Sequence, residues 1–192
     1  MGSRAPRTGR RPAVNVPNPV QSLHHFAYRC RNAEETRHFY EDILGMPLVH
    51  TVYHDHVPST GEYHPYFHIF FQMRDGGCLA FFDLLDDTGY VPDPETPLWV
   101  NHLAMKVSSR EELSAAKARL EVHEIEVLGI VDHKIFDSIY FFDPNGIRLE
   151  LTYDTASAET IARLAADAHA GLAQRDAKFA ERQAKLAGEA RP

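Results

Sequence analysis

Two histidines and one glutamate occupy positions from which they could bind one metal ion together. His25 begins the segment HFAYR and His102 begins HLAMK, 77 residues later. Glu150 lies in RLELT, where polar and apolar residues alternate, so Glu150 belongs to the polar face of a strand. Two imidazoles and one carboxylate leave three coordination positions open, which suits Fe(II) and tolerates Mn(II). A single histidine in a strand is usually an ordinary half-buried residue. The prediction of a metal site therefore depends on the equivalent positions of the two histidines.

The order of the expected elements repeats once along the chain. Each half contains a strand, a helix and three further strands, over 23–30, 33–44, 48–54, 66–73 and 78–84, and then over 101–107, 109–122, 126–132, 138–142 and 148–153. The sequence therefore predicts an α+β fold of two βαβββ modules, residues 23–84 and 101–153, that form one open barrel. A pseudo-twofold axis relates the modules, so the equivalent residues His25 and His102 should converge between them.

Capping and turn residues support these boundaries. Asn32 can cap the first helix and Gly45 can end it, while Ser109 and Glu112 have the spacing of a capping box at the second. The segments RDGG and DPNG contain residues that tolerate positive φ, so each predicts a hairpin between two strands.

The regions outside the modules differ in composition. Residues 1–20 combine arginines and prolines without periodicity, which predicts a disordered basic arm. The domain proper should then cover residues 21–155. Residues 156–192 are rich in alanine with interleaved charges, which predicts a helical extension on the surface or against a second subunit of a homodimer.

Composition excludes several classes of protein. The net charge of −7 argues against a nucleic-acid-binding domain. No apolar run approaches the roughly 18 residues that a membrane span needs. Two cysteines are too few for a disulfide framework and are typical of a reducing compartment, so we expect a cytoplasmic protein.

The layout resembles the vicinal oxygen chelate superfamily of glyoxalases, fosfomycin-resistance enzymes and extradiol dioxygenases. That superfamily opens with a strand histidine and continues with a helix that carries Phe-Tyr and ends in Leu-Gly. Here these are His25, FY at 39–40 and LG at 44–45. The resemblance covers residues 23–153 and implies that His25, not His24, is the metal ligand, with His24 directed to the opposite face.

The second half has a more specific resemblance. Residues 131–150, VDHKIFDSIYFFDPNGIRLE, look like the signature of type I extradiol ring-cleavage dioxygenases. In that family the last Glu of the signature binds iron, the Tyr hydrogen-bonds the substrate, and the His lines the substrate and oxygen pocket. The resemblance implies these roles for Glu150, Tyr140 and His133.

The first half separates this reading from a glyoxalase. Glyoxalase I-like members use a fourth protein ligand on the last strand of the first module. The corresponding positions are Ala80, Phe81 or Phe82, and none of these side chains can bind a metal. A three-ligand site leaves room for a bidentate catecholate and dioxygen, which favours an oxygenase.

One departure from the extradiol pattern affects the acid/base residue. Extradiol enzymes with two domains carry a catalytic histidine just before the last strand of the first module. At that position this chain has GGC, residues 76–78. We predict that His68 takes the acid/base function, because it lies on a strand with aromatic residues on the same face. His64 and His133 are the alternatives.

The expected activity follows from these assignments. The inner-face residues Phe70, Phe142 and Tyr140 should receive a flat aromatic guest, and Arg148 or a histidine should meet its polar substituent. The prediction is an Fe(II)-dependent dioxygenase that uses O₂ to open a small aromatic diol, a catechol-type ring.

Two alternatives remain open at this point. One is a fosfomycin-resistance-like thiol transferase, which also uses His, His and Glu but needs several basic residues for a phosphonate. The other is a metal-free binding protein of the bleomycin-resistance type.

Overall fold

A computed structural model describes residues 17–189. The predicted basic arm therefore lies outside the described residues, except for 17–20, which form no regular element. The elements follow in this order: β1 (His25–Cys30), α1 (Ala33–Arg37), η1 (His38–Ile43), β2 (Leu48–His56), β3 (Tyr63–Gln72), β4 (Cys78–Asp83), β5 (Leu103–Lys106), α2 (Arg110–Val122), β6 (Leu128–Asp132), β7 (Phe136–Phe142), β8 (Arg148–Asp154), α3 (Ala158–Leu172) and α4 (Arg175–Glu189).

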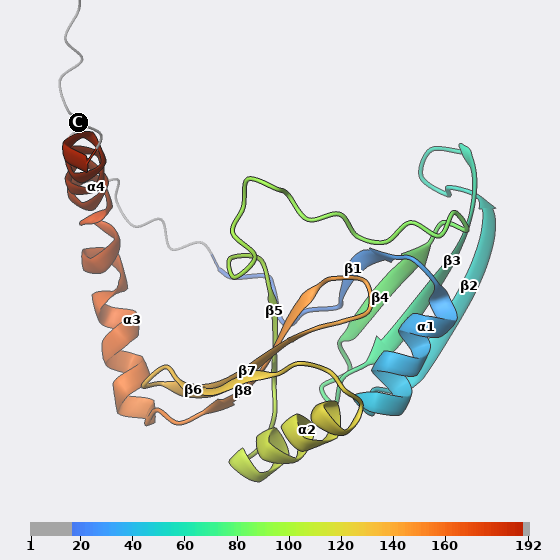
Figure 1. Cartoon of the computed structure of the whole chain (residues 1–192), viewed down its shortest axis with the longest axis horizontal. Helices are drawn as coiled ribbons and strands as arrows, with labels where there is room; N and C mark the ends of the chain where they lie inside the picture. The colour runs from blue at the N-terminus through green and yellow to red at the C-terminus, as the bar shows by residue number, and fades with distance from the viewer. Residues whose placement is uncertain (1–16, 190–192) are drawn as a thin grey trace, which may run out of the picture.

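The strands form two sheets with the same topology. Their orders are β1-β4-β3-β2 and β5-β8-β7-β6, and in each sheet the first strand pairs parallel to the last strand of its module. In Figure 1 α2 lies below β7 and β8, and α1 lies in front of the strands of the first sheet. The predicted α+β fold of two βαβββ modules with a C-terminal helical extension is confirmed.

Some element boundaries differ from the sequence prediction. The first helix changes at His38 into η1, a π-helix, where the amide of Leu44 donates to the carbonyl of Phe39 at 3.0 Å. A wider helical turn leaves no mark in the apolar spacing, which is why we expected one continuous helix. Strand β5 begins at Leu103, so His102 lies just before the strand and not within it.

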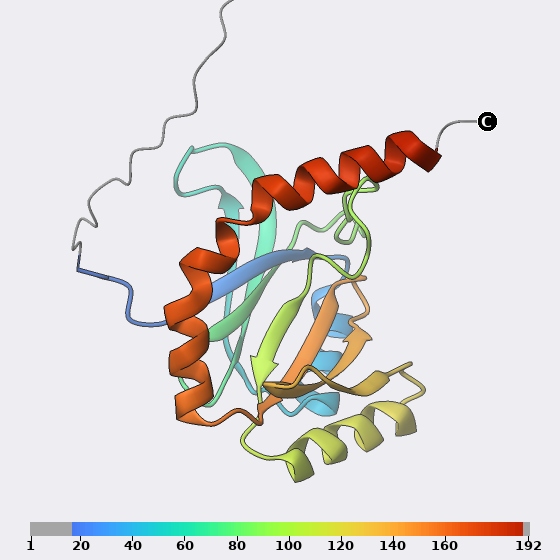
Figure 2. The ribbon, with the colours of Figure 1, turned by 90° about the vertical axis from the view of Figure 1, so that its left-hand side faces the viewer.

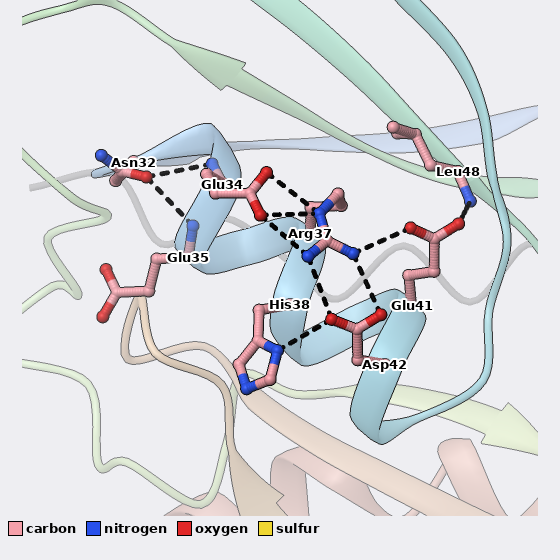
Figure 3. A network of polar contacts seen from close by, with 8 residues as sticks. All are labelled: Asn32, Glu34, Glu35, Arg37, His38, Glu41, Asp42 and Leu48. Atoms are coloured by element: carbon pink, nitrogen blue, oxygen red, sulfur yellow. Dashed lines mark hydrogen bonds and ion pairs between the residues drawn. The ribbon is translucent and has the colours of Figure 1, made fainter.

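A side-chain cap fixes the start of α1 (Figure 3). Asn32 has extended backbone geometry, and its Oδ1 accepts hydrogen bonds from the amides of Glu34 and Glu35, both at 3.0 Å. These bonds satisfy two amides that the first turn of a helix leaves without intrahelical partners. The predicted cap is confirmed, and so is the cap of α2, where Ser109 accepts from the amide of Glu112 at 3.2 Å.

One arginine holds α1 and η1 together (Figure 3). Arg37 forms ion pairs with Glu34, Glu41 and Asp42 at 2.8, 3.0 and 3.0 Å. Glu41 also accepts a hydrogen bond from the amide of Leu48, so the same network reaches the start of β2. The change from α-helix to π-helix therefore lies inside a set of ionic contacts.

Both modules contribute to a single hydrophobic core. Phe39 of the first module packs against Phe141 of the second, with ring centres 6.3 Å apart. Tyr40 and Phe71 stack beside them and are fully buried. Because the two halves share this core, they behave as one domain and hold the two faces of the candidate site in a fixed relation.

Polar contacts also cross the boundary between the modules. The Tyr40 hydroxyl donates to Asp143 at 3.1 Å, and the Asn145 side-chain amide donates to the Thr36 hydroxyl at 3.2 Å. The backbone amide of Arg31 donates to Asn145 Oδ1 at 2.9 Å. Burial raises the pKa of Asp143, and its hydrogen bonds oppose that shift.

We expect Asp143→Ala to weaken the junction between the modules. The change removes the acceptor of Tyr40 and of the backbone amides of Asn145 and Ile147, all of which are buried. A buried donor left without a partner costs roughly 1–3 kcal/mol. Urea unfolding should therefore show a loss of at least about that size, whereas Asp154→Ala, at an exposed carboxylate, should change stability by less than about 0.5 kcal/mol. Equal losses in the two variants would contradict this role of Asp143.

The C-terminal helices extend away from the sheets. Figure 1 shows α3 and α4 to one side of the body, and Figure 2 shows them in front of it, joined at a bend. Their residues from 161 to 188 are all exposed, including Ile161, Leu172 and Phe179. The predicted helical extension is therefore present, and its partner, if it has one, is still only a prediction. In the described part of the chain no helix is both long and apolar enough to cross a membrane.

Candidate metal and substrate site

His102 and Glu150 lie in direct contact. His102 Nε2 is 3.0 Å from Glu150 Oε2, and Glu150 is only 3% exposed. His102 Nδ1 lies 3.1 Å from the carbonyl oxygen of Val100. A carbonyl oxygen only accepts, so Nδ1 must carry a proton and donate it. The turn before β5 therefore orients the imidazole so that Nε2 faces the carboxylate.

This geometry fits a divalent cation. An Nε2 lone pair that faces a carboxylate oxygen is repelled unless a positive charge, either a proton or a metal ion, lies between them. Metal-binding histidines usually donate their second ring N–H to a carbonyl or carboxylate, as His102 does to Val100. The second module thus presents one imidazole and one carboxylate in a form suited to a metal.

Two hydroxyls hold the other oxygen of Glu150. Ser138 donates a short hydrogen bond to Oε1, and the Tyr140 hydroxyl lies 3.0 Å from the same oxygen. Oε2 is therefore left to face His102. Burial, followed by the hydrogen bond to Glu150, raises the pKa of Tyr140, so Tyr140 keeps its proton at neutral pH.

His133 extends this chain of contacts towards solvent. Its Nε2 lies 2.8 Å from the Tyr140 hydroxyl oxygen, and its side chain is exposed. Because the carboxylate of Glu150 only accepts, Tyr140 donates to Glu150 and His133 donates to Tyr140. The three residues to which the extradiol signature assigns a role are therefore joined in one chain of hydrogen bonds.

Arg148 and Phe142 lie beside this chain of hydrogen bonds. The Arg148 guanidinium is 4.4 Å from the centre of the Tyr140 ring, and Arg148 pairs with Phe142 across the two strands. Phe142, the last residue of β7, is 45% exposed. The strand register thus places a cation and an uncovered ring on the face of the sheet that carries Tyr140 and Glu150.

The first module presents a cluster of rings instead. His25 lies 6.3 Å from His68 and 5.7 Å from Phe70 between ring centres. His24 Nδ1 is 2.7 Å from His25 Nδ1, which requires one of these rings to donate to the other. The expectation that His24 points to the opposite face is therefore wrong, because His24 precedes β1 and strand alternation does not apply to it.

His68 has an unusual environment. Its ring stacks on Phe82 with centres 3.7 Å apart, and its Nε2 is buried without a hydrogen-bond partner. Burial, followed by the nearby His25 and His50, lowers the pKa of His68 to about 4. His68 is therefore neutral near pH 7, which makes it a poor source of a proton. His64, the alternative on β3, is exposed.

Strand register identifies the symmetric counterpart of Glu150. Ala104 pairs with Glu150 in the second module, and Ala27 pairs with Ala80 in the first. Ala80 is fully buried and takes the place of Glu150. By the same rule Phe70, which pairs with Ala80, takes the place of Tyr140. The first module therefore lacks a carboxylate where the second has one.

The structure brings together some of the predicted site residues and not others. His102, Glu150, Tyr140 and His133 form one connected group. Within residues 17–189 no hydrogen bond or ring contact joins His25 to that group, and no group of three or more His, Cys, Asp or Glu side chains is arranged to hold a metal ion. The assignment of His25 as the third ligand is still a prediction.

Sequence reasoning missed Ser138 as part of the site. Its hydroxyl orients the Glu150 carboxylate, and it is fully buried. The alternation of β7 places Ser138 and Tyr140 on one face, and that face meets Glu150 on the neighbouring strand. That pattern was the available signal, but serine alone carries little chemical information.

A family model, the Glyoxalase/Bleomycin resistance protein/Dioxygenase superfamily, matches residues 22–151. The match contains the first module, the second module up to residue 151, and every candidate site residue. The chain belongs to this superfamily. Its members include enzymes of several kinds as well as binding proteins, so membership establishes the fold and a shared type of site but not one reaction.

One curated relative is described as a dioxygenase. It is the "Putative ring-cleaving dioxygenase MhqA" of Bacillus subtilis (strain 168), 26% identical over 122 residues. The match covers 64% of this chain but only 36% of the relative, so the chain spans little more than a third of that protein's length.

Solved structures of the superfamily share the fold. A glyoxalase/dioxygenase from Nostoc punctiforme is 24% identical, with a TM-score of 0.55 over 77% of this chain and 100% of its own. A glyoxalase family protein from Enterococcus faecalis is 27% identical, with a TM-score of 0.51 over 69% of this chain and 97% of its own. A mutant of the fosfomycin resistance protein FosX from Listeria monocytogenes, in complex with Mn(II) and dihydroxypropylphosphonic acid, is 18% identical, with a TM-score of 0.52 over 74% of this chain and 98% of its own.

Proposed function

We propose that this superfamily member is an Fe(II)-dependent extradiol dioxygenase that opens a catechol-type ring with O₂. The observation that carries the proposal is the contact of the Tyr140 hydroxyl with both Glu150 and His133. These three residues are the ones that the extradiol signature assigns to the iron, the substrate and the oxygen pocket. The likeness to a relative described as a ring-cleaving dioxygenase supports the same reading.

His25, His102 and Glu150 are the residues that would hold the metal. Fe(II), or Mn(II) in its place, would supply the open positions at which a catechol and O₂ are bound and brought together. His102 is oriented for this task by Val100, and Glu150 by Ser138 and Tyr140. A fixed orientation of the ligands keeps the remaining positions free for substrate.

Tyr140 and His133 would carry out proton transfer at the site. Tyr140 keeps its hydroxyl proton at neutral pH. The hydroxyl donates to Glu150 in this structure, and it could donate to a substrate oxygen instead by rotating about its C–O bond. His133 Nε2 touches that hydroxyl, and its ring is exposed. A proton can therefore pass between solvent and the site through His133 and Tyr140.

The missing fourth ligand favours an oxygenase over a glyoxalase. Ala80 stands where the symmetry of the modules would place a second carboxylate. A methyl group there leaves more room beside the metal for a two-oxygen substrate and dioxygen. The neighbouring rings of Phe70 and Phe142 supply flat surfaces for an aromatic guest, and Arg148 supplies a charge for an anionic substituent.

Tyr140→Phe is expected to impair catalysis while iron stays bound. The change removes only the hydroxyl that would contact the substrate, and a hydrogen bond to a charged group contributes roughly 1.5–3 kcal/mol. We expect kcat/KM to fall by about one to two orders of magnitude. Protein loaded with excess Fe(II) should still hold about one iron per chain, because Ser138 continues to orient the Glu150 carboxylate. Tyr53→Phe removes an exposed hydroxyl on β2 and should leave both quantities unchanged. If Tyr140→Phe loses its iron, the residue acts mainly on Glu150 and not on the substrate.

Oxygen uptake tests the proposed reaction itself. The protein is loaded with Fe(II) under anaerobic conditions and mixed with a panel of catechols that carry small or amino-acid-like substituents. We expect one dioxygen to be consumed for each catechol, with a yellow ring-opened product. Failure of the whole panel together with thiol transfer to an epoxide would favour the fosfomycin-resistance-like alternative. Failure of both, with tight binding of an intact aromatic ligand by metal-free protein, would favour the binding-protein alternative.

A further inference from the structure

A cavity lies at the junction of the two modules, apart from the candidate metal site. Its volume is about 710 Å³, within the range of sites that hold small molecules. The end of η1 and the β3–β4 turn contribute one wall, and β5, α2 and β8 contribute the other. None of the residues assigned to the metal, the substrate or the proton path lines it.

The cavity lies on the opposite face of the second sheet from Glu150. Met105 and Leu151 pair across β5 and β8, and both line the cavity. The adjacent pair, Ala104 and Glu150, belongs to the metal site, and successive residues of a strand point to opposite faces. A molecule in this cavity would therefore be separated from the catechol site by the sheet.

The apolar lining is aliphatic. None of the described residues that line the cavity is aromatic. The apolar side chains of the lining are flexible or small: Ile43, Leu44, Met46, Pro47, Met73, Met105, Val107, Ala115, Ala116 and Leu151. The unbranched side chains of methionine adapt to guests of irregular shape, and the lining offers no ring on which an aromatic guest could stack. The metal site, by contrast, is bordered by Phe70, Phe142 and Tyr140. The lining thus favours a flexible aliphatic guest over an aromatic one.

Of the three basic residues that line the cavity, one forms no ion pair with a carboxylate in the described part of the chain. Arg74 pairs with Glu112, and Lys106 pairs with Asp154. The guanidinium of Arg119 on α2 makes a single hydrogen bond in the described part of the chain, a weak one from its Nη1 to the carbonyl of Ile43 at 3.4 Å. Asp75, which also lines the cavity, accepts a hydrogen bond from the amide of Gly77. A guanidinium that borders an apolar cavity and lacks an anionic partner is suited to one carboxylate of a ligand.

We propose that this cavity binds a medium-chain aliphatic monocarboxylate. Its acid group pairs with Arg119, and its hydrocarbon chain lies among Met46, Met73 and Met105. A ligand in this position contacts both modules and stabilises the form in which they are packed together. The inference is independent of the proposed dioxygenase activity.

Calorimetric titration of octanoate into the full chain tests the proposal. We expect saturable binding of one octanoate per chain and a higher unfolding temperature in its presence. Octan-1-ol, which has the same chain without the charge, should bind at least tenfold more weakly, and benzoate should not displace octanoate. Arg119→Gln should weaken octanoate binding at least tenfold, because it removes one charge-assisted contact.

Two further variants control for indirect effects. Lys117→Gln changes a neighbouring cation of α2 that pairs with Glu121 and does not line the cavity, so octanoate binding should be unchanged. Ala115→Phe adds a ring at the cavity wall and should weaken binding without altering the charge. Glu150→Ala should bind octanoate normally, so a failure of the metal assignment does not affect this test.

Several outcomes would overturn the proposal. Octanoate could fail to bind at millimolar concentration, or several equivalents could bind without saturation. Octan-1-ol could also bind as tightly as octanoate. Binding that is unchanged in both Arg119→Gln and Ala115→Phe would also overturn it. If Arg119→Gln unfolds, Ala115→Phe and the comparison with octan-1-ol decide the question.

Discussion

Glu150→Ala is expected to abolish stoichiometric iron binding. Glu150 supplies the only carboxylate in the predicted ligand set, and its Oε2 is the atom that faces His102 at 3.0 Å. Loss of residues that merely orient a metal ligand costs 10–100-fold in metal affinity, so loss of a ligand should cost at least about 10²-fold. Iron analysis of protein loaded anaerobically and then desalted should fall from about one iron per chain to nearly none.

A matched variant separates this effect from a general loss of acidic charge. Asp154 lies at the end of the same strand but is exposed and pairs with Lys106. Asp154→Ala should therefore retain wild-type iron. Circular dichroism should show that Glu150→Ala is folded, and Glu150→Gln, which keeps the side-chain shape, should lose iron as well. Stoichiometric iron in the Glu150 variants would remove the residue from the metal site.

His133→Phe is expected to have the largest effect on turnover among variants that keep their iron. His133 contacts the Tyr140 hydroxyl and reaches solvent, whereas His68 is held neutral by burial, with a pKa of about 4. A general acid or base contributes typically 10²–10⁴-fold, so kcat should fall within that range while anaerobic substrate binding changes little.

His68→Phe is the matched comparison, since it makes the same substitution on the other module. If His133 carries the proton, His68→Phe should lower kcat by less than about tenfold. A large loss of kcat in His68→Phe with near-wild-type turnover in His133→Phe would instead support the assignment made from the sequence. Near-wild-type turnover in both variants would exclude both histidines and leave His64 or water.

The architecture could be predicted from the sequence because local signals agreed with one another. Asn32, Ser109 and the Gly-containing hairpin turns each marked a boundary, and the repeated strand–helix–strand order marked the duplication. The equivalence of the halves also identified the position at which this chain lacks the fourth metal ligand of glyoxalases. The sequence limited it to Ala80, Phe81 or Phe82, and the pairing of Ala27 with Ala80 selects Ala80.

The remaining features depend on tertiary contacts that a sequence pattern does not contain. The low pKa of His68 arises from burial against Phe82 and from two nearby histidines, and no local pattern predicts it. Helix periodicity does not distinguish the π-helix η1 from an α-helix over six residues. The orientation of His102 depends on the carbonyl of Val100, a backbone group that any residue would provide.

Anaerobic titration of Fe(II) into wild type and His25→Ala tests the central claim most directly. In the proposed site one iron is held jointly by His25 of the first module and by His102 and Glu150 of the second. We expect about one iron per chain in wild type and loss of most of that iron in His25→Ala, with His24→Ala unaffected. Stoichiometric iron in His25→Ala, with an affinity equal to that of wild type, would contradict that claim.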